Sequence, residues 1–366
     1  MITSQIAEVR SMKLLIGLVM AATLPAQEAG VAIRWRDARE LLVEGQGWRE
    51  TKQAFDRLPA RAEGLVRKEV WDLAHDSAGV AVRFVTDAPT IRARWTLKSE
   101  KLAMPHMPAT GVSGLDLYVR LPGGWRWVAN GRPEKQANEQ TLLANWPGGR
   151  REYMLYLPLY NGVMSVEVGV PEGANLEAAA VGAKPVVVYG SSIAQGGCAS
   201  RPGMAYPAIL GRRLDRPVIN LGFSGNGKSE PELAELLNEI EASVYVYDSL
   251  PNLSSVEAWE RVEPFVRKLR YAHPETPVVL VENAVYANAQ FVEQRRTIAA
   301  EKNVVLRGVY EKLRKEGDRR VFYVRGGELY GDDGEATVDG VHPTDVGFMR
   351  MAEAIGPVVR RALRAR

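Results

Sequence analysis

Two different patterns of hydrophobic and polar positions follow each other along the chain. From about residue 30 to 180, apolar and polar residues alternate in short runs, as in 79–86 and 91–97. Successive side chains of a strand point to opposite faces, so this alternation predicts half-buried antiparallel strands. We expect a β-sandwich or jelly roll here. Further runs of this kind, separated by Pro, Gly and Asn, cover 115–120, 125–128, 151–157 and 163–170.

From about residue 184, short apolar runs alternate with helical stretches. Helices are expected at 231–241 and 256–272, the second opened by a capping box of Ser254 and Glu257. Alternating strands and helices predict a parallel sheet covered on both faces, with its ligand site where the strands end. The change of pattern divides the chain into domains 27–180 and 181–366. Strands are expected at 185–189, 218–221, 244–247, 278–281 and 321–324.

Tryptophan is concentrated in the first half, which holds seven of the eight residues of this type. The simplest interpretation is that these aromatic rings fill the core of the sandwich. The alternative is a platform on which sugar rings stack.

Composition limits the possible classes of protein. The 366 residues, 46% of them hydrophobic and 25% charged, suit a folded protein of about two domains. A formal net charge of +3 is too small to indicate a nucleic-acid partner. The basic residues Arg360, Arg361, Arg364 and Arg366 are explained by the solvated face of a terminal helix. A single cysteine, Cys198, excludes an intramolecular disulfide.

The N-terminus has the pattern of a signal peptide. Lys13 precedes the apolar run 14–24, and Pro25-Ala26-Gln27 follows it. A basic start, a short apolar run and small residues before a polar one are typical of an exported protein. The run is too short to span a bilayer comfortably, and a buried helix is the alternative. We expect residues 1–26 to be removed near Ala26, and the mature protein to be secreted or periplasmic.

Candidate chemistry lies at a strand end and on a late loop. The apolar run 186–189 ends at Gly190-Ser191-Ser192, which places a hydroxyl on a tight turn at the carboxyl edge of the sheet. About 150 residues later, Asp339 and His342 stand three residues apart. Such a pair can supply a general base and the group that orients it. On an α/β pattern and in this order, these residues indicate a serine esterase.

The segment 222–229 fits the phosphate-loop pattern G-x-x-x-x-G-K-[ST]. A phosphate loop needs its helix to begin near Gly227, and Pro231 would then delete an early intrahelical bond. Glu230 would also face the anion unfavourably. A helix that begins after Ser229 suits Pro231 better. In a hydrolase, the loop could instead supply a backbone N–H to an oxyanion, with an asparagine amide from the next strand end.

Four short blocks in order resemble the SGNH hydrolases, also called GDSL-like esterases. They are Gly190–Ile193, Asn220–Gly225, Pro251-Asn252 and Asp339–His342. The resemblance implies a nucleophile at Ser192, a base at His342 and an acid at Asp339. It implies an oxyanion hole formed by Ser192, Gly225 and Asn252. Gly114-Leu115-Asp116-Leu117-Tyr118 is similar to the GxDLY signature of a β domain fused ahead of one branch of these esterases, which includes acetyl esterases acting on sugars.

This resemblance implies a flavodoxin-like α/β domain with a parallel sheet, preceded by a β-sandwich or jelly-roll domain. The sequence departs from the family at two places. Ser191 stands where the family usually has Asp, and the Gly-x-Asn-Asp block is reduced to residues 250–253. Asn226 and Asn220 are therefore alternatives to Asn252 as the oxyanion donor.

Other reactive residues carry weaker signals. Cys198 could be a nucleophile, but no second motif accompanies it, so we expect a buried thiol or a wall of the site. His75, His106 and His273 are isolated in the sequence, which argues against a metal site. Asp332 and Asp333 are explained by a turn before the catalytic loop. We expect no metal and no organic cofactor.

The expected substrate is a small-molecule or oligosaccharide ester, with an O-acetylated carbohydrate such as a xylo-oligosaccharide preferred. The loops 195–197 and 201–203 are small or polar and offer little lining for a long acyl chain. A lipase or thioesterase acting on longer acyl chains is the alternative. A non-catalytic carbohydrate-binding protein is a more remote one. The sequence leaves the oligomeric state open.

Overall fold

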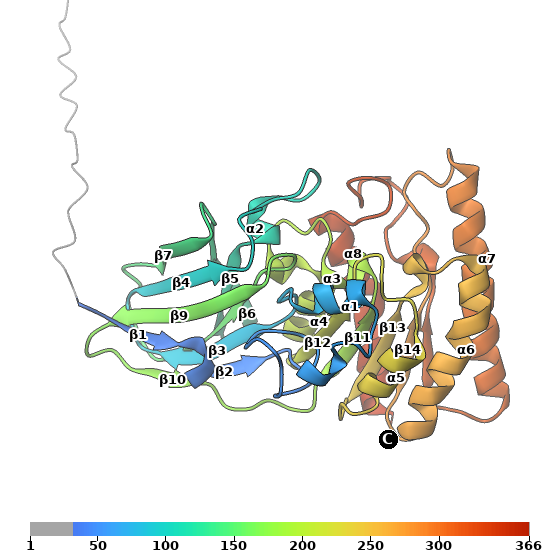
Figure 1. Cartoon of the computed structure of the whole chain (residues 1–366), viewed down its shortest axis with the longest axis horizontal. Helices are drawn as coiled ribbons and strands as arrows, with labels where there is room; N and C mark the ends of the chain where they lie inside the picture. Colours follow the sequence, from blue (N-terminus) through green and yellow to red (C-terminus); the bar gives the residue numbers. More distant parts are fainter. Residues whose placement is uncertain (1–31, 366) are drawn as a thin grey trace, which may run out of the picture. The chain divides into compact units, whose positions relative to one another are not determined.

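The first half of the chain folds into two antiparallel sheets (Figure 1). The computed structural model describes residues 32–365, so the expected signal peptide lies outside the described residues. In one sheet the strand order is β1 (Ile33–Asp37), β9 (Val163–Pro171), β4 (Ile91–Leu97) and β7 (Ala137–Leu143). In the other it is β10 (Leu176–Ala178), β3 (Ala81–Thr86), β8 (Arg151–Tyr156), β5 (Leu115–Leu121) and β6 (Gly124–Gly131), and β2 (Leu42–Glu44) pairs with β3.

The core of this sandwich is formed by the inward residues of both sheets, as the alternation predicts. Phe84 of β3, Trp95 of β4 and Leu117 of β5 are buried in one cluster with Val168 of β9. Short helices α1 (Lys68–Ala74) and α2 (Ala109–Val112) interrupt the β structure. The sequence runs do not predict the strands β1, β2, β7 and β10. Their alternation is weak, β2 and β10 are only three residues long, and β1, β7 and β10 all lie at sheet edges.

The expectation that the tryptophans fill the sandwich core is wrong for several of them. Trp95 does lie between the two sheets. Trp125 is buried on the outer face of the second sheet, and Trp71 packs in a cluster with the α/β sheet. Trp127 is 50% exposed. Both faces of the second sheet are thus largely covered, so aromatic residues occur on its outer face as well.

The second half forms a five-stranded parallel sheet in the order β12 (Val218–Gly222), β11 (Val186–Gly190), β13 (Val244–Asp248), β14 (Val278–Val281) and β15 (Val321–Val324). This 2-1-3-4-5 order is flavodoxin-like and confirms the expected fold class. Helices α3 (Ser192–Gln195), α4 (Tyr206–Leu214), α5 (Pro231–Leu237), α6 (Ser255–Ala272), α7 (Glu293–Lys315) and α8 (Asp345–Arg364) connect and follow the strands.

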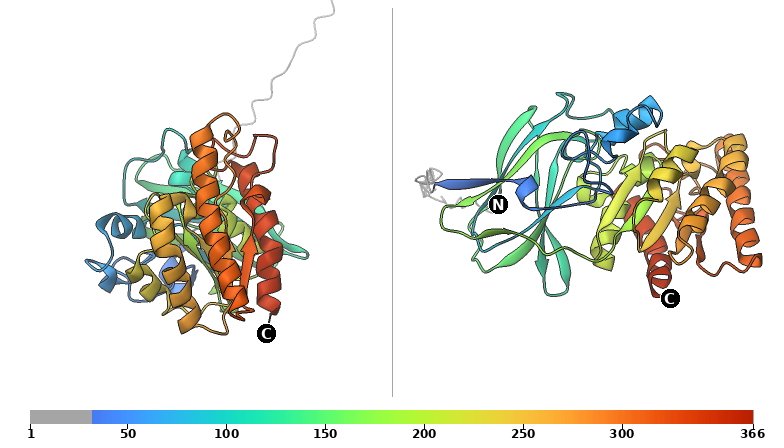
Figure 2. Two further views of the ribbon diagram at one scale, coloured as in Figure 1. Left: turned by 90° about the vertical axis from the view of Figure 1, so that its right-hand side faces the viewer. Right: turned by 60° about the horizontal axis from the view of Figure 1, so that its bottom comes forward.

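Helices cover the parallel sheet on its faces (Figure 2). Alternate residues of each strand pack against different helices. In β11, Val187 and Tyr189 pack with the residues of α5, α6 and α7, whereas Val186 and Val188 pack with those of α4 and α8. Strands that are buried on both faces read as continuous apolar runs, which is the pattern that the sequence shows. No helix in residues 32–365 is both long and apolar enough to cross a membrane.

Helix boundaries confirm two expectations. Ser254 Oγ accepts from the Glu257 amide at 3.1 Å, and the Glu257 carboxylate accepts from the Ser254 amide at 2.9 Å, completing the capping box. Helix α5 begins at Pro231 after Glu230, so no helix starts at Gly227 as a phosphate loop would require. On α8, Arg360, Arg361 and Arg364 are exposed.

Residues 33–365 form one compact unit, because the outer face of the second sheet packs on the α/β half. Asp116 of the GxDLY segment is fully buried there. It accepts hydrogen bonds from Arg201 Nη1 at 2.7 Å, the Gly203 amide at 2.8 Å and Trp127 Nε1 at 2.8 Å. Burial raises the pKa of Asp116. The neighbouring Leu115 and Leu117 point into the sandwich, so this strand joins both halves.

We expect residues 181–366 expressed alone to be insoluble or inactive. Removal of the first half would leave Arg201 without its buried acceptor and expose the apolar surface around Ala208. The measurement is soluble yield and esterase turnover of the fragment beside residues 27–366. A soluble, fully active fragment would show that the β half is a detachable module.

Candidate active site

Ser192 lies where the sequence places it, at the first position of α3 directly after β11. Its side chain faces the late loop, and the residue is largely buried. Ser191, which stands where related esterases have Asp, caps α3 through its Oγ, which accepts from the Ile193 amide at 3.2 Å. This departure therefore leaves the start of the helix intact.

The structure brings Ser192, His342 and Asp339 together in one chain of hydrogen bonds. Ser192 Oγ lies 2.9 Å from His342 Nε2, and His342 Nδ1 lies 2.7 Å from Asp339 Oδ2. With the proton of the imidazole on Nδ1, Nε2 is free to accept the serine proton. The arrangement has the geometry of a nucleophile, a base and an orienting acid.

Asp339 is held in its ionised form by its own loop. Its Oδ1 accepts from the backbone amides of His342 at 2.8 Å and Val341 at 2.9 Å. Burial opposes ionisation of this carboxyl, but these amides and the His342 ring outweigh it and lower the pKa to about 2. The carboxylate is therefore charged at neutral pH and can stabilise an imidazolium beside it.

Arg295 of α7 supports the same loop, a role that no motif in the sequence indicates. Its Nη1 donates to the Asp339 carbonyl at 3.0 Å and to Asn288 Oδ1 at 2.9 Å. The guanidinium lies against Gly340, whose φ is +87°. A side chain at Gly340 would therefore be strained and would collide with Arg295. Tyr330 completes the support by donating to the Val341 carbonyl at 2.7 Å.

The predicted oxyanion loop lies against the strand end that carries Ser192. The Phe223 amide donates to the Gly190 carbonyl at 3.0 Å. Gly225 has a φ of +68°, a conformation that favours glycine, and its amide has no acceptor within residues 32–365. Asn252 ends the short 3-10 helix η4 (Leu250–Asn252), and its Nδ2 donates to the Phe223 carbonyl at 3.0 Å. A second, longer contact of 3.4 Å joins it to the Gly227 carbonyl.

The two alternative asparagines have other partners. Asn220 is buried, and its amide donates to the Ala194 carbonyl at 2.7 Å while its Oδ1 accepts from the Gly222 amide at 2.9 Å. Asn226 Nδ2 donates to the Ser224 carbonyl at 2.9 Å. These contacts favour Asn252 over both, because its second N–H makes only the long contact to Gly227. That Asn252 and Gly225 act on an oxyanion stays a prediction.

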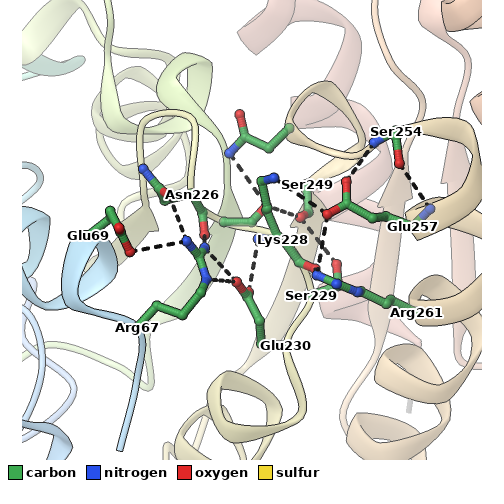
Figure 3. A network of polar contacts seen from close by, with 12 residues as sticks. Arg67, Glu69, Asn226, Lys228, Ser229, Glu230, Ser249, Ser254, Glu257 and Arg261 are labelled. Atoms are coloured by element: carbon green, nitrogen blue, oxygen red, sulfur yellow. Dashed lines mark hydrogen bonds and ion pairs between the residues drawn. The ribbon is translucent and has the colours of Figure 1, made fainter. Parts of the chain in front are cut away.

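The first half of the chain holds the oxyanion loop in place (Figure 3). Arg67 donates to Asn226 Oδ1 and to the Asn226 carbonyl, each at 2.8 Å, and it pairs with Glu230. Arg57, fully buried, donates to the Gly222 carbonyl at 2.6 Å, and burial lowers its pKa to about 10. No sequence pattern indicates these contacts, which join residues about 160 positions apart.

Gln195 had been expected in a polar loop that flanks the site, but it is fully buried and points inward. Its Oε1 accepts from the Ser224 amide at 2.9 Å, and its Nε2 donates to Asp76 Oδ2 and to the Leu159 carbonyl, each at 3.1 Å. The side-chain amide of Gln195 therefore links α3 by hydrogen bonds to the oxyanion loop and to the first half of the chain. Gln195 is therefore a structural residue and not a wall of the substrate site.

The structure shows the surroundings of Cys198 and of the three histidines that are isolated in the sequence. Cys198 is buried, and burial together with the nearby Asp339 carboxylate raises its pKa to about 12, so it is a neutral thiol at neutral pH. His75 Nδ1 lies 2.9 Å from Asp56 Oδ1, and His273 Nε2 lies 2.9 Å from the Asn238 carbonyl oxygen. His106, although isolated in the sequence, lies near His342 in the structure. Its ring centroid lies 6.0 Å from that of His342.

Comparison with known proteins agrees with this fold. Residues 183–360 match the GDSL-like Lipase/Acylhydrolase family, and residues 33–176 match the GxDLY domain described as the N-terminus of Esterase_SGNH_hydro-type. A solved protein from Bacteroides ovatus ATCC 8483, assigned to the GDSL-like lipases, is 36% identical, with a TM-score of 0.86, over 92% of this chain and 99% of that one. The chain belongs to the GDSL-like lipase/acylhydrolase family, also called the SGNH hydrolases, whose members are esterases and acylhydrolases.

More distant solved structures share the fold over nearly the whole chain. The salicylyl-acyltransferase SsfX3 from a tetracycline biosynthetic pathway is 22% identical, with a TM-score of 0.73, over 91% of this chain and 99% of that one. A family two carbohydrate esterase from Cellvibrio japonicus is 15% identical, with a TM-score of 0.60, over 91% and 98%. A search of curated sequences returned no match.

Proposed function

We propose that this protein is a secreted serine esterase that removes acetyl groups from O-acetylated carbohydrates, such as xylo-oligosaccharides, through an acyl-enzyme. The observation that carries the proposal is the chain of hydrogen bonds from Ser192 through His342 to Asp339, with lengths of 2.9 and 2.7 Å. An intact nucleophile, base and acid argue against the alternative of a non-catalytic carbohydrate-binding protein. The export motif at 13–27 supports secretion.

In the proposed mechanism, His342 Nε2 takes the proton of Ser192 as its Oγ attacks the ester carbonyl. Asp339 keeps the imidazole in the required tautomer and stabilises its charged form. The developing oxyanion accepts hydrogen bonds from the amides of Ser192 and Gly225 and from the side chain of Asn252. His342 then protonates the leaving alcohol, and a water activated by the same imidazole releases the acid. These steps need no metal and no organic cofactor.

The choice of an acetyl group on a carbohydrate rests on the surroundings of Ser192. Gly197 lies directly beside the His342 ring and Tyr160, which leaves little depth for a long acyl chain on that side. The leading β half is shared with the family two carbohydrate esterase from Cellvibrio japonicus, whose fold matches across both halves. Both points support a short acyl group on a polar alcohol.

A specific feature favours the alternative, a lipase or thioesterase that accepts longer acyl chains. The loop 282–292 contacts the catalytic loop, because the Ala287 amide donates to the Gly340 carbonyl at 3.2 Å. This loop carries Phe291, which is 80% exposed, and Val285, which is 51% exposed. The expectation of an active site without apolar flanking segments overlooked these side chains. An acyl chain could lie along them.

An acyl-chain series tests the two possibilities. We expect kcat/KM on p-nitrophenyl esters to fall at least tenfold from acetyl to octanoyl, because Gly197, Tyr160 and the His342 ring leave little depth for the longer chain. Acetate release from acetylated xylan is measured beside it. Faster turnover on the octanoyl ester, with no acetate released from the polysaccharide, would replace the deacetylase with the alternative.

A further inference from the structure

A rigid turn of the β half reaches the catalytic histidine. Met104 and Met107 exchange both backbone hydrogen bonds, at 3.0 and 3.1 Å, which leaves Pro105 and His106 at the tip. Met107 is buried in the cluster that also contains Ile193 and Ala199 of the α/β half. The backbone bonds and the buried anchor together fix the direction in which His106 projects.

The turn and the catalytic loop are also joined through one intermediate residue. Thr110 Oγ1, three residues beyond the turn, donates to the Ser200 carbonyl at 2.6 Å. The Ser200 amide in turn donates to Asp345 Oδ1 at 2.9 Å. Asp345 is the first residue of α8 and follows His342 by three positions. The separation of the two histidines is therefore set by packing and hydrogen bonds on both sides.

The His106 side chain is exposed, so its ring nitrogens are accessible to a bound molecule. Its ring centroid lies 6.0 Å from that of His342, at an interplanar angle of 49°. A histidine that is held in place by its backbone and exposed beside the proposed catalytic base has the properties of a substrate contact.

We infer that His106 binds a hydroxyl group of the alcohol that leaves the ester. His342 must lie within hydrogen-bond reach of the leaving oxygen in order to protonate it. In a sugar, the carbon next to the esterified carbon often carries a free hydroxyl. When the ester oxygen lies at His342, this hydroxyl lies on the side where the His106 ring can reach it. An imidazole can donate to or accept from that hydroxyl. The inference rests on the proposed esterase function, and it specifies that the alcohol part of the ester substrate carries several hydroxyl groups.

The test compares His106→Ala and His106→Asn with the wild type on two matched substrates. One is a monoacetylated methyl xyloside with a free hydroxyl beside the ester, and the other is its counterpart that lacks this hydroxyl. Loss of one neutral hydrogen bond should lower kcat/KM of the alanine variant about 3- to 10-fold on the first substrate only. The asparagine variant, which keeps a donor and an acceptor, should recover part of the loss.

Phenyl acetate, whose leaving group has no second hydroxyl, should be cleaved within twofold of the wild-type rate by both variants. Equal losses on both xylosides, or no loss on either, would overturn the inference. Equal losses with a shifted pH profile would assign His106 to tuning of His342 instead. If the wild type cleaves phenyl acetate but neither xyloside, the carbohydrate proposal fails. His106 is then tested separately by comparing kcat/KM on glycerol monoacetate, which has a neighbouring hydroxyl, with kcat/KM on propyl acetate, which lacks one.

Discussion

Substitution of Ser192 by alanine should abolish esterase activity while leaving the fold intact. Ser192 Oγ is the hydroxyl that lies 2.9 Å from His342 Nε2. Without it, no acyl-enzyme can form, and only binding and the oxyanion donors remain to assist water. Losses of about 10⁴-fold or more are usual for this kind of change. The measurement is kcat on p-nitrophenyl acetate, with the circular dichroism spectrum as evidence of folding.

Ser191→Ala is the matched control, because Ser191 is adjacent, buried and has no imidazole partner. Loss of its hydrogen bond to the Ile193 amide should cost about 1 kcal/mol of stability, and turnover should stay within about tenfold of the wild type. A folded Ser192→Ala protein that keeps more than a few per cent of wild-type turnover would remove Ser192 from the role of nucleophile.

The elements of the α/β half could be predicted from the sequence because local rules determine them. Continuous apolar runs placed the five strands, and Pro231 placed the start of α5 after the loop that resembles a phosphate loop. Ser192, Asp339 and His342 could be predicted as candidate site residues because each lies in a short motif whose spacing reflects a strand end or a tight loop. The structure places these three in hydrogen-bond contact.

The supporting residues could not be predicted, because their roles depend on contacts between distant segments. Arg57 and Arg67 act on backbone atoms about 160 residues away, and a backbone carbonyl leaves no mark in the sequence. Arg295 contacts the loop of Asp339 from the first turn of α7, 44 residues earlier in the chain. His106 reaches His342 only through the packing of one half on the other. A histidine that is isolated in the sequence can therefore still belong to a site.

The placement of tryptophans failed for a related reason. Composition showed that the β half is rich in aromatic residues, but it could not show which face of a sheet they occupy. Trp125 is buried because the outer face of the second sheet meets Ala208 of α4. The register of β5 and β6 is interrupted between Leu117 and Tyr118, so alternation along β6 does not continue across this point. A pattern of period two cannot anticipate such a shift.

Substitution of Asn252 by alanine should lower kcat about 10²- to 10³-fold with little change in KM. An oxyanion donor strengthens its hydrogen bond as negative charge develops, so its loss is felt mainly in the transition state. Asn252 is well placed for this role, since its amide lies against the loop that carries Gly225. Asn252 belongs to the helix η4, which Lys302 stabilises by donating from its Nζ to the Leu250 carbonyl at 2.9 Å.

Two further variants separate catalysis from stability. Asn252→Asp keeps the size of the side chain but replaces the donor with an acceptor, so we expect a loss of kcat at least as large as that of Asn252→Ala. Ser254→Ala removes the cap of α6 two residues away and should cost about 1 kcal/mol of stability without the loss of kcat. The measurements are kcat and KM on p-nitrophenyl acetate together with the melting temperature. A rise in KM with unchanged kcat in Asn252→Ala would make Asn252 a substrate contact, and the third oxyanion donor would then lie elsewhere.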